Sequence, residues 1–392
     1  MKSLRKFLDK IKPNFQEGGK LSKLQSVYDG METFLFTPND TSKSGVHIHD
    51  SNDMKRSMIT VVVALMPCLL FAMYNIGFQH FKAIGIEASF WQMFCFGLLA
   101  MLPEIVVSYA VGLGIEFIGA QIHHKEIQEG FLVTGILIPL IVPINTPLWM
   151  TAVATAFAVI FAKEIFGGTG MNIFNVALIT RAFLFFAYPS KMSGDAAFVK
   201  IDSAFGFGGG NVVDGFSGAT PLGDIATKAM DKVPSTLDAF IGLIPGSPGE
   251  TSMIAILIGA AILLITGIAS WRVMVSVFAG GLAMAAIAHS FPGLDPYPAS
   301  MVDPMKQICL GGFAFAAVFM ATDPVTGART KIGQYIYGFL IGVFAILIRV
   351  YNGGYPEGAM LAVLLMNAFA PLIDYCVVQV NINRRLKRSK AQ

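Results

Sequence analysis

Long apolar runs alternate with short polar segments over most of the chain. Ten apolar runs follow a polar stretch of about 56 residues, at roughly 57–77, 94–118, 130–143, 147–165, 172–188, 252–270, 272–290, 308–322, 332–350 and 357–378. A straight helix needs about 20 apolar residues to cross about 30 Å of hydrocarbon. The pattern therefore predicts an all-α polytopic membrane protein with about ten transmembrane helices.

Two of these runs, 130–143 and 308–322, are too short for a straight crossing. Each begins at a Gly-Phe pair and ends beside a proline. Such segments are typical of half-helices or re-entrant segments, which exist at membrane depth only where protein buries their free backbone groups.

The surroundings of the two short runs are similar. Each is followed by a long apolar run, a Gly-Gly pair and a last run that contains an asparagine, Asn175 or Asn367. We interpret this as a duplication with five-helix repeats at 57–188 and 252–378. An odd number of helices inverts the second copy across the membrane. Chance similarity between apolar sequences is the alternative.

The charges are concentrated at the two ends of the chain. Ten Lys and Arg residues lie between Lys2 and Arg56, and five lie between Arg384 and Lys390. Basic segments beside membrane spans remain in the cytoplasm, which explains these ends better than nucleic-acid binding does. We expect a cytoplasmic extension at 1–56, with an amphipathic surface helix at 1–12, and a basic cytoplasmic tail at 379–392. The 189–251 loop is then periplasmic.

Composition excludes several classes of function. Hydrophobic residues make up 54% of the chain and charged residues 14%, which is not the composition of a soluble enzyme. The four cysteines lie in or at the end of apolar runs without a Cys-x-x-Cys pattern, so neither a disulfide nor a metal site is indicated. No dinucleotide fingerprint follows a strand, and NADH oxidation is not assigned to this chain.

Ionisable residues within the apolar runs mark an ion path or a buried partner, because each is costly in hydrocarbon. Structural roles are the alternative for every one of them. The set comprises Glu104, Glu164, Arg181, Asp323, Arg349 and Asp374, with Glu129 at the mouth of the third run.

A glycine-rich turn at 167–170 precedes two asparagines, Asn172 and Asn175. We expect a helix to begin near Asn172. Amides three residues apart then share a helix face and offer donors and acceptors to a planar heterocycle. Hydrogen bonding between helices is the alternative.

The polar run Asp214-Gly-Phe-Ser-Gly-Ala-Thr220 lies in the longest interval between spans. It resembles the flavinylation motif Asp-Gly-x-Ser-Gly/Thr-Ala-Thr, which occurs in the B subunit of the Na+-translocating NADH:quinone oxidoreductase and in the D subunit of the Rnf complex. The resemblance implies a covalent FMN on Thr220 through a phosphoester, with Asp214, Ser217 and Gly218 as the other motif residues of the site.

Further segments resemble the same B subunit, among them Lys163-Glu-Ile-Phe-Gly-Gly-Thr-Gly170 and Met320-Ala-Thr-Asp-Pro324. The resemblance implies a urea-transporter-like fold and membership of a six-subunit bacterial inner-membrane translocase, with the A, C, D, E and F subunits as partners. The enzyme would be an NADH:ubiquinone reductase that exports Na+, in which covalent FMN passes electrons through riboflavin to ubiquinone or menaquinone.

The cofactors can be assigned to residues on this basis. We expect riboflavin against Asn172 and Asn175, quinone at Glu129, Gly130 and Phe131, and a sodium pathway at Asp323, Asp374 and Glu129. Other functions stay open from composition and spacing alone. They are the D subunit of an Rnf-type ferredoxin:NAD+ oxidoreductase, a flavin-free secondary transporter or channel, and a scaffold subunit.

Overall fold

Apolar helices form most of the molecule, for which we obtained a computed structural model. The structure describes residues 2–15, 28, 32, 44–46, 54–123, 130–213, 216–291, 298–352 and 357–390. Six helical segments within these ranges are long and apolar enough to cross a membrane. They are built on α3 (Met54–Ile84), α4 (Phe90–His123), α6 (Leu148–Ala162), α12 (Trp271–Ser290), α15 (Lys331–Tyr351) and α16 (Ala359–Lys390).

The remaining apolar runs form shorter helices. Three of these are α5 (Phe131–Ile141), α7 (Val176–Ala187) and α11 (Met253–Ile265). The run at 308–322 is broken into the end of α13 (Pro304–Cys309), α14 (Phe313–Phe315) and a π-helix, η5 (Ala316–Met320). The prediction of short helical segments in the runs 130–143 and 308–322 is confirmed. No strand occurs in the described ranges, and the chain is an all-helical, multi-pass membrane protein.

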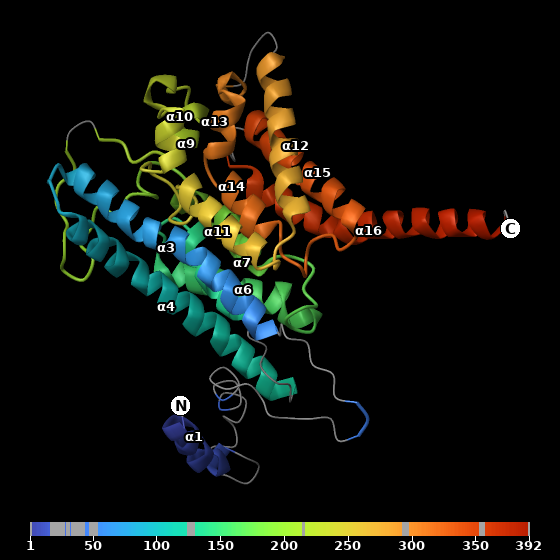
Figure 1. The fold of residues 1–392 in the computed structure, drawn as a ribbon. Helices are drawn as coiled ribbons and strands as arrows, with labels where there is room; N and C mark the ends of the chain where they lie inside the picture. The colour runs from blue at the N-terminus through green and yellow to red at the C-terminus, as the bar shows by residue number, and fades with distance from the viewer. Residues whose placement is uncertain are drawn as a thin grey trace.

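Short helices occupy the polar segments. The interval from 189 to 251 contains α8 (Pro189–Met192), α9 (Pro221–Ala226), η3 (Met230–Lys232) and α10 (Thr236–Ile241). Two further short helices are η2 (Glu164–Phe166), after α6, and η4 (Pro298–Met301), before α13. Figure 1 shows α9 and α10 beside α13, at the end of the bundle away from α1.

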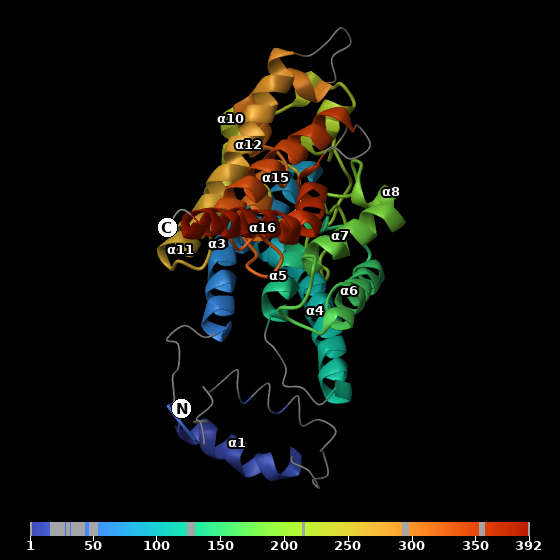
Figure 2. The same ribbon diagram turned by 90° about the vertical axis from the view of Figure 1, so that its right-hand side faces the viewer.

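The predicted amphipathic helix is α1 (Lys2–Phe15). Leu8 is buried, and the Tyr28 hydroxyl donates a hydrogen bond to its carbonyl oxygen at 2.9 Å. In both views α1 lies apart from the apolar helices (Figures 1 and 2). Most of the 1–56 extension lies outside the described residues.

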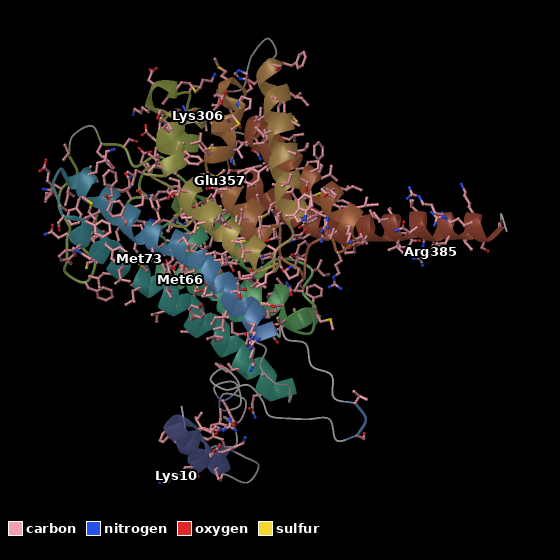
Figure 3. All side chains as sticks on the ribbon, viewed as in Figure 1. Lys10, Met66, Met73, Lys306, Glu357 and Arg385 are labelled. Atoms are coloured by element: carbon pink, nitrogen blue, oxygen red, sulfur yellow. The ribbon has the colours of Figure 1, made fainter. Side chains whose placement is uncertain are left out.

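Charged side chains are distributed unevenly over the helices. Lys10 lies on α1 and Arg385 on the end of α16 that projects from the bundle, whereas Glu357 lies among the helices (Figure 3). The last turns of α16, with their basic residues, are exposed. A helix of 32 residues is about 48 Å long at about 1.5 Å per residue, so α16 exceeds the hydrocarbon thickness.

Helices α12 and α15 pack through small residues. A Cβ added at Gly342 would lie 2.1 Å from the carbonyl oxygen of Val277, and one at Gly280 would lie 2.1 Å from that of Phe339. Both distances are impossible for a real side chain, so only glycine permits this approach of the two backbones. Close approach through small residues is how helices associate in a membrane, where burial of apolar surface supplies no driving force.

A similar contact fixes each short apolar segment. A Cβ at Gly112 of α4 would lie 1.8 Å from the ring tip of Phe131, the first residue of α5. A Cβ at Gly281 of α12 would lie 2.4 Å from the ring tip of Phe313, the first residue of α14. In each case a fully buried phenylalanine follows a glycine and packs against a glycine of an earlier long helix.

Candidate functional site

A cavity of about 130 Å³ brings together residues from distant parts of the chain. Its wall is formed by parts of α3, α5, α7 and α11 and by the turns after α6 and η5. The polar residues on its wall are Ser57, Thr134, Lys163, Thr169, Asn172, Asn175, Thr322 and Asp323.

Asn175 links the two halves of the chain inside this cavity. Its Oδ1 accepts a hydrogen bond from the Leu178 N–H at 3.3 Å and thereby caps α7, and its Nδ2 donates to Asp323 Oδ2 at 3.3 Å. Asp323 also accepts from the Val325 N–H at 3.0 Å and from the Thr326 hydroxyl at 3.1 Å. The Asp323 carboxylate is therefore held in one orientation by donors from two regions.

The prediction that a helix begins near Asn172 is wrong. Helix α7 begins at Val176 with Asn175 as its N-cap, so the two amides do not share a helix face. The preceding turn has positive φ at Gly167, Gly168 and Gly170, and this backbone cannot continue into a right-handed helix. The Asn172 Nδ2 donates to the Phe174 carbonyl oxygen at 3.0 Å. Both asparagines nevertheless line the same cavity.

The three residues expected at the quinone site differ in their position relative to the cavity. Gly130 lines the cavity, and a Cβ there would lie 2.5 Å from the Thr169 methyl carbon. Phe131 is fully buried between α4 and α5, with its ring centroid 5.8 Å from Lys163 Nζ. Glu129 lies outside the described residues.

Asp374 of α16 does not line this cavity. Its carboxylate accepts hydrogen bonds from the Arg329 N–H at 2.7 Å, the Thr330 N–H at 3.0 Å and the Thr330 hydroxyl at 2.6 Å. Thr330 is also the N-cap of α15. Asp374 thus fixes the start of α15 against α16.

Thr220 lies at a second site, at the start of α9. Its Oγ1 accepts a hydrogen bond from the Gly223 N–H at 3.1 Å, and its side chain is half-buried. Ser217 Oγ donates to Asp195 Oδ2 at 3.5 Å, and a Cβ on Gly218 would lie 2.3 Å from the Asp195 carbonyl oxygen. Asp214 lies outside the described residues. The described motif residues therefore pack against the loop at Asp195.

The carboxyl group of Asp224, close to Thr220 in the sequence, has a raised pKa. Asp224 lies in the first turn of α9, and its N–H donates to the Thr220 carbonyl oxygen at 2.9 Å. Burial raises the pKa of the Asp224 carboxyl, and the nearby Lys232 ammonium opposes this shift.

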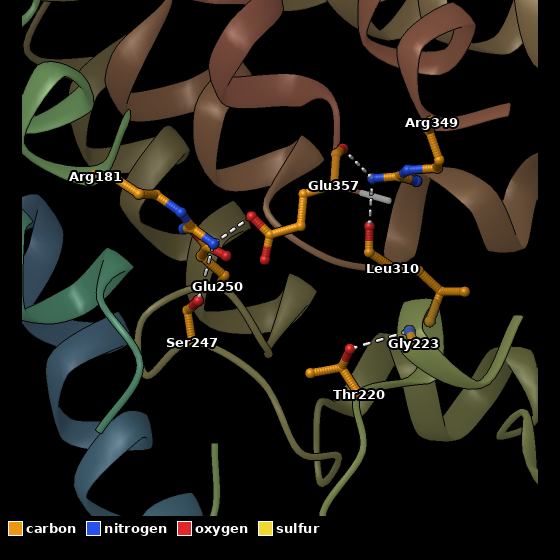
Figure 4. Close-up of polar contacts among 8 residues, drawn as sticks. All are labelled: Arg181, Thr220, Gly223, Ser247, Glu250, Leu310, Arg349 and Glu357. Carbon is orange, nitrogen blue, oxygen red and sulfur yellow. Dashed lines mark hydrogen bonds and ion pairs between the residues drawn. The ribbon is translucent and has the colours of Figure 1, made fainter. Parts of the chain in front are cut away.

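A small cavity next to Thr220 is bounded by a buried charge cluster (Figure 4). Its volume is about 20 Å³, and Glu250 and Glu357 are on its wall with Thr220. Arg181 of α7 donates to Glu250 Oε1 at 2.5 Å, to Ser247 Oγ at 3.3 Å and to Glu357. Arg349 donates to backbone carbonyl oxygens, among them those of Leu310 at 3.0 Å and Glu357 at 3.3 Å.

The sequence singled out Arg181 and Arg349 but missed Glu250 and Glu357. Glu250 lies in a polar segment between apolar runs and Glu357 at the first position of the run 357–378, and neither position carries a signal of burial. Each follows a proline closely in the sequence, in Pro-Gly-Ser-Pro-Gly-Glu250 and Tyr-Pro-Glu357. The buried Arg181, which has no acidic residue in its own run, was the one signal that acidic partners had to come from elsewhere.

Comparison with known proteins identifies the family. The profile of the NQR2, RnfD, RnfE family matches residues 41–383. A protein of Chromohalobacter salexigens, named as the B subunit of Na(+)-translocating NADH-quinone reductase, is 44% identical over 99% of this chain and 97% of its own length. Proteins of the same name from Ectopseudomonas mendocina and Pseudomonas aeruginosa are 43% and 41% identical, each over 98% of this chain and 99% of their own length. The chain belongs to the NQR2, RnfD, RnfE family.

Proposed function

We propose that the chain is the membrane subunit of a Na+-translocating NADH:quinone reductase that carries FMN covalently on Thr220. The observation that carries this proposal is the complete flavinylation heptapeptide ending at Thr220, whose hydroxyl lies half-buried in a loop between the apolar helices. The names of the relatives favour this reductase over an Rnf complex, although the family includes both.

The residues at Thr220 fit a phosphoester. Thr220 Oγ1 accepts a hydrogen bond from Gly223, and it can keep this role when a phosphoryl group replaces its proton. The 20 Å³ cavity beside it has room for about one water molecule. The flavin ring would therefore lie outside this cavity, toward a partner subunit or the periplasm. Bound FMN supplies the redox chemistry, and Asp214, Ser217 and Gly218 shape the loop for attachment.

The larger cavity is the proposed place of riboflavin and quinone. Asn172 fits riboflavin better than Asn175 does, because the Asn175 amide already caps α7 and holds Asp323. Asn172 lines the cavity, and its Oδ1 accepts no hydrogen bond from the described residues. Quinone would enter beside Gly130, with Glu129 and Phe131 adjacent to it. Sodium would interact with Asp323, Asp374 and Glu129 along the pathway.

The proposed architecture is two inverted repeats of five helices, similar to urea transporters. The paired contacts of Gly112 with Phe131 and of Gly281 with Phe313 support it, because they place corresponding segments in similar packing. Both termini would be cytoplasmic in the bacterial inner membrane, with Thr220 periplasmic. The partners would be the A, C, D, E and F subunits of a six-subunit complex.

Replacement of Thr220 by valine tests the proposal. Valine has nearly the same volume but cannot form a phosphoester, so Thr220→Val should remove covalent FMN and leave assembly intact. The measurements are peptide mass spectrometry of residues 189–251, flavin fluorescence of the denatured protein on a gel, and quinone reductase activity, which should fall at least 100-fold. Ser217→Ala should slow attachment without moving it.

Thr227→Val is the matched control. Thr227 is exposed at the end of the same helix, and its hydroxyl donates to the Gly223 carbonyl oxygen at 3.1 Å. This variant should keep full flavin content. Covalent FMN in Thr220→Val, or normal turnover without it, would refute the proposal.

A further inference from the structure

Helices α4 and α6 run parallel in a fixed register. The Thr151 hydroxyl donates to Glu104 Oε1 at 3.3 Å, and Lys163, at the end of α6, donates to Glu116. The residue numbers differ by 47 in both pairs. The two contacts lie 12 residues apart on each helix, or about 18 Å at about 1.5 Å per residue. Figure 2 shows the two helices side by side, in teal and green.

This register places Ser108 opposite Thr155. Ser108 lies one turn after Glu104 on α4, Thr155 lies one turn after Thr151 on α6, and their numbers also differ by 47. Glu104 is 4% exposed and the other three side chains are fully buried. We call Glu104, Ser108, Thr151 and Thr155 the α4–α6 polar cluster.

Three oxygen atoms of the cluster have no hydrogen-bond partner among the described residues. They are Glu104 Oε2, Ser108 Oγ and Thr155 Oγ1. The buried ion pairs in these ranges join Lys163 to Glu116 and Arg181 to Glu250 and Glu357, and none reaches Glu104. The Lys200 ammonium acts on Glu104 only from beyond ion-pair distance, and a buried carboxylate oxygen or hydroxyl without a hydrogen-bond partner is strongly unfavourable. The cluster therefore lacks a partner for these three oxygen atoms.

The chemistry of the missing partner follows from the groups that face it. One carboxylate and three hydroxyls offer only oxygen ligands, which hard cations prefer. A single carboxylate balances one positive charge, so a monovalent cation leaves the cluster neutral whereas a divalent cation does not. Within the described residues no group of three His, Cys, Asp or Glu side chains could hold a metal ion, which also disfavours a divalent site here.

We propose that the α4–α6 polar cluster binds one Na+ ion. Glu104 supplies the charge, and Ser108, Thr151 and Thr155 supply neutral oxygen ligands. The choice of Na+ among monovalent cations rests on the function proposed above. This site is separate from the cavity at Asp323, since no residue of the cluster lines that cavity. The competing explanation is a protonated Glu104 that is hydrogen-bonded to the hydroxyls and binds no cation.

Direct binding of 22Na+ to the purified, oxidised complex tests the site without turnover. Glu104→Gln, Ser108→Ala and Thr155→Val should each weaken one Na+ site at least tenfold, and Thr155→Ser should retain it. Thr155→Val keeps the side-chain volume and tests the hydroxyl alone. Thr180→Val is the matched control, because Thr180 is also fully buried but its hydroxyl donates to Val176 of its own helix at 3.0 Å.

Wild-type stoichiometry and affinity in Ser108→Ala and Thr155→Val would overturn the proposal, even if Glu104→Gln alone bound less Na+. That result would mean that the hydroxyls are not ligands. Size-exclusion chromatography of the purified complex reports on assembly of each variant, so a folding defect is recognised independently. Because Na+ binding is measured without electron transfer, its outcome does not depend on whether Thr220 carries FMN.

Discussion

The helix pairs α4–α6 and α12–α15 have the same arrangement but different interfaces. The two helices of each pair run parallel. In α4–α6 the contacting residues are 47 positions apart in the sequence. In α12–α15, Ser270 in the turn before α12 contacts Gln334 of α15, 64 positions later. In α12–α15 the backbones touch at Gly280 and Gly342. The buried hydroxyl there, that of Ser276, donates to backbone carbonyl oxygens of its own helix and, at 3.4 Å, to that of Gln334 on α15.

The α4–α6 pair instead keeps one buried carboxylate oxygen and two hydroxyl oxygens without partners among the described residues. In α12–α15 the glycine contacts are accompanied by hydrogen bonds from the Ser270 and Ser276 hydroxyls to Gln334, so these polar groups have partners. Oxygen atoms without partners distinguish the α4–α6 pair, and the proposed Na+ ion would supply their partner. Glycine contacts hold α12 close to α15, whereas the oxygen atoms without partners between α4 and α6 are the groups that would bind a ligand.

The largest expected effect comes from separating α12 and α15. Gly342→Ala would place a Cβ 2.1 Å from the Val277 carbonyl oxygen and 2.5 Å from the Gly281 nitrogen. Because both atoms belong to the backbone, the helices must move apart, and we expect a loss of about 3 kcal/mol in stability. The thermal unfolding midpoint of the purified complex measures it.

Gly114→Ala on α4 is the control, since no atom lies within 4 Å of a Cβ there. It should stabilise the helix by about 0.5–1 kcal/mol. Equal midpoints for the two variants would show that the glycine contacts do not determine the packing of α12 on α15.

An intermediate effect is expected where glycines contact phenylalanine rings. Gly112→Ala and Gly281→Ala should each cost about 1–2 kcal/mol, because the rings of Phe131 and Phe313 can shift in part. The two should differ in function. Only Gly112→Ala should raise the KM for quinone, since Phe131 follows Gly130 of the proposed quinone site. Steady-state kinetics with unfolding midpoints separate the two effects, and an equal rise in KM in both variants would contradict the placement.

The smallest effects concern single tyrosine hydroxyls in the two halves. The Tyr337 hydroxyl donates to Asn367 Oδ1 at 2.7 Å, and the Tyr109 hydroxyl donates to the Leu132 carbonyl oxygen at 2.5 Å. Tyr337→Phe should cost about 1 kcal/mol, because it leaves an amide oxygen buried without a partner. Tyr109→Phe should cost less, about 0.5–1 kcal/mol, if the α5 backbone retains a bond to that carbonyl. The order of the two unfolding midpoints checks this expectation.

Periodicity and composition were sufficient for the membrane class, the six long apolar helices and α1. The arrangement of ten spans stays a prediction. They failed at helix ends that depend on backbone conformation. The run 252–270 contains α11, which ends at Ile265 shortly before Gly267 with its positive φ of 71°. An apolar run shows that a segment is buried, but it does not show where the chain turns within the buried region.

The candidate sites were predicted only as separate residues. Thr220, Asn172, Asn175 and Asp323 were named from the sequence, but the cavity that joins Asn175 to Asp323 depends on a contact across 148 residues. The register of 47 between α4 and α6 is equally invisible in the sequence, because Glu104 and Thr155 lie in different apolar runs. Tertiary packing decides which polar residues meet.

The charge cluster around Arg181 has a consequence for biosynthesis. Glu250 follows Arg181 by 69 residues and Glu357 follows it by 176. At a synthesis rate of about 5–20 residues per second, these separations correspond to about 3–14 s and about 9–35 s. The arginine must therefore stay in contact with water or the insertion machinery until the first carboxylate has been translated. The nascent chain reaches a charge-balanced state in two stages, and the second is completed only when the last helix begins to emerge from the ribosome.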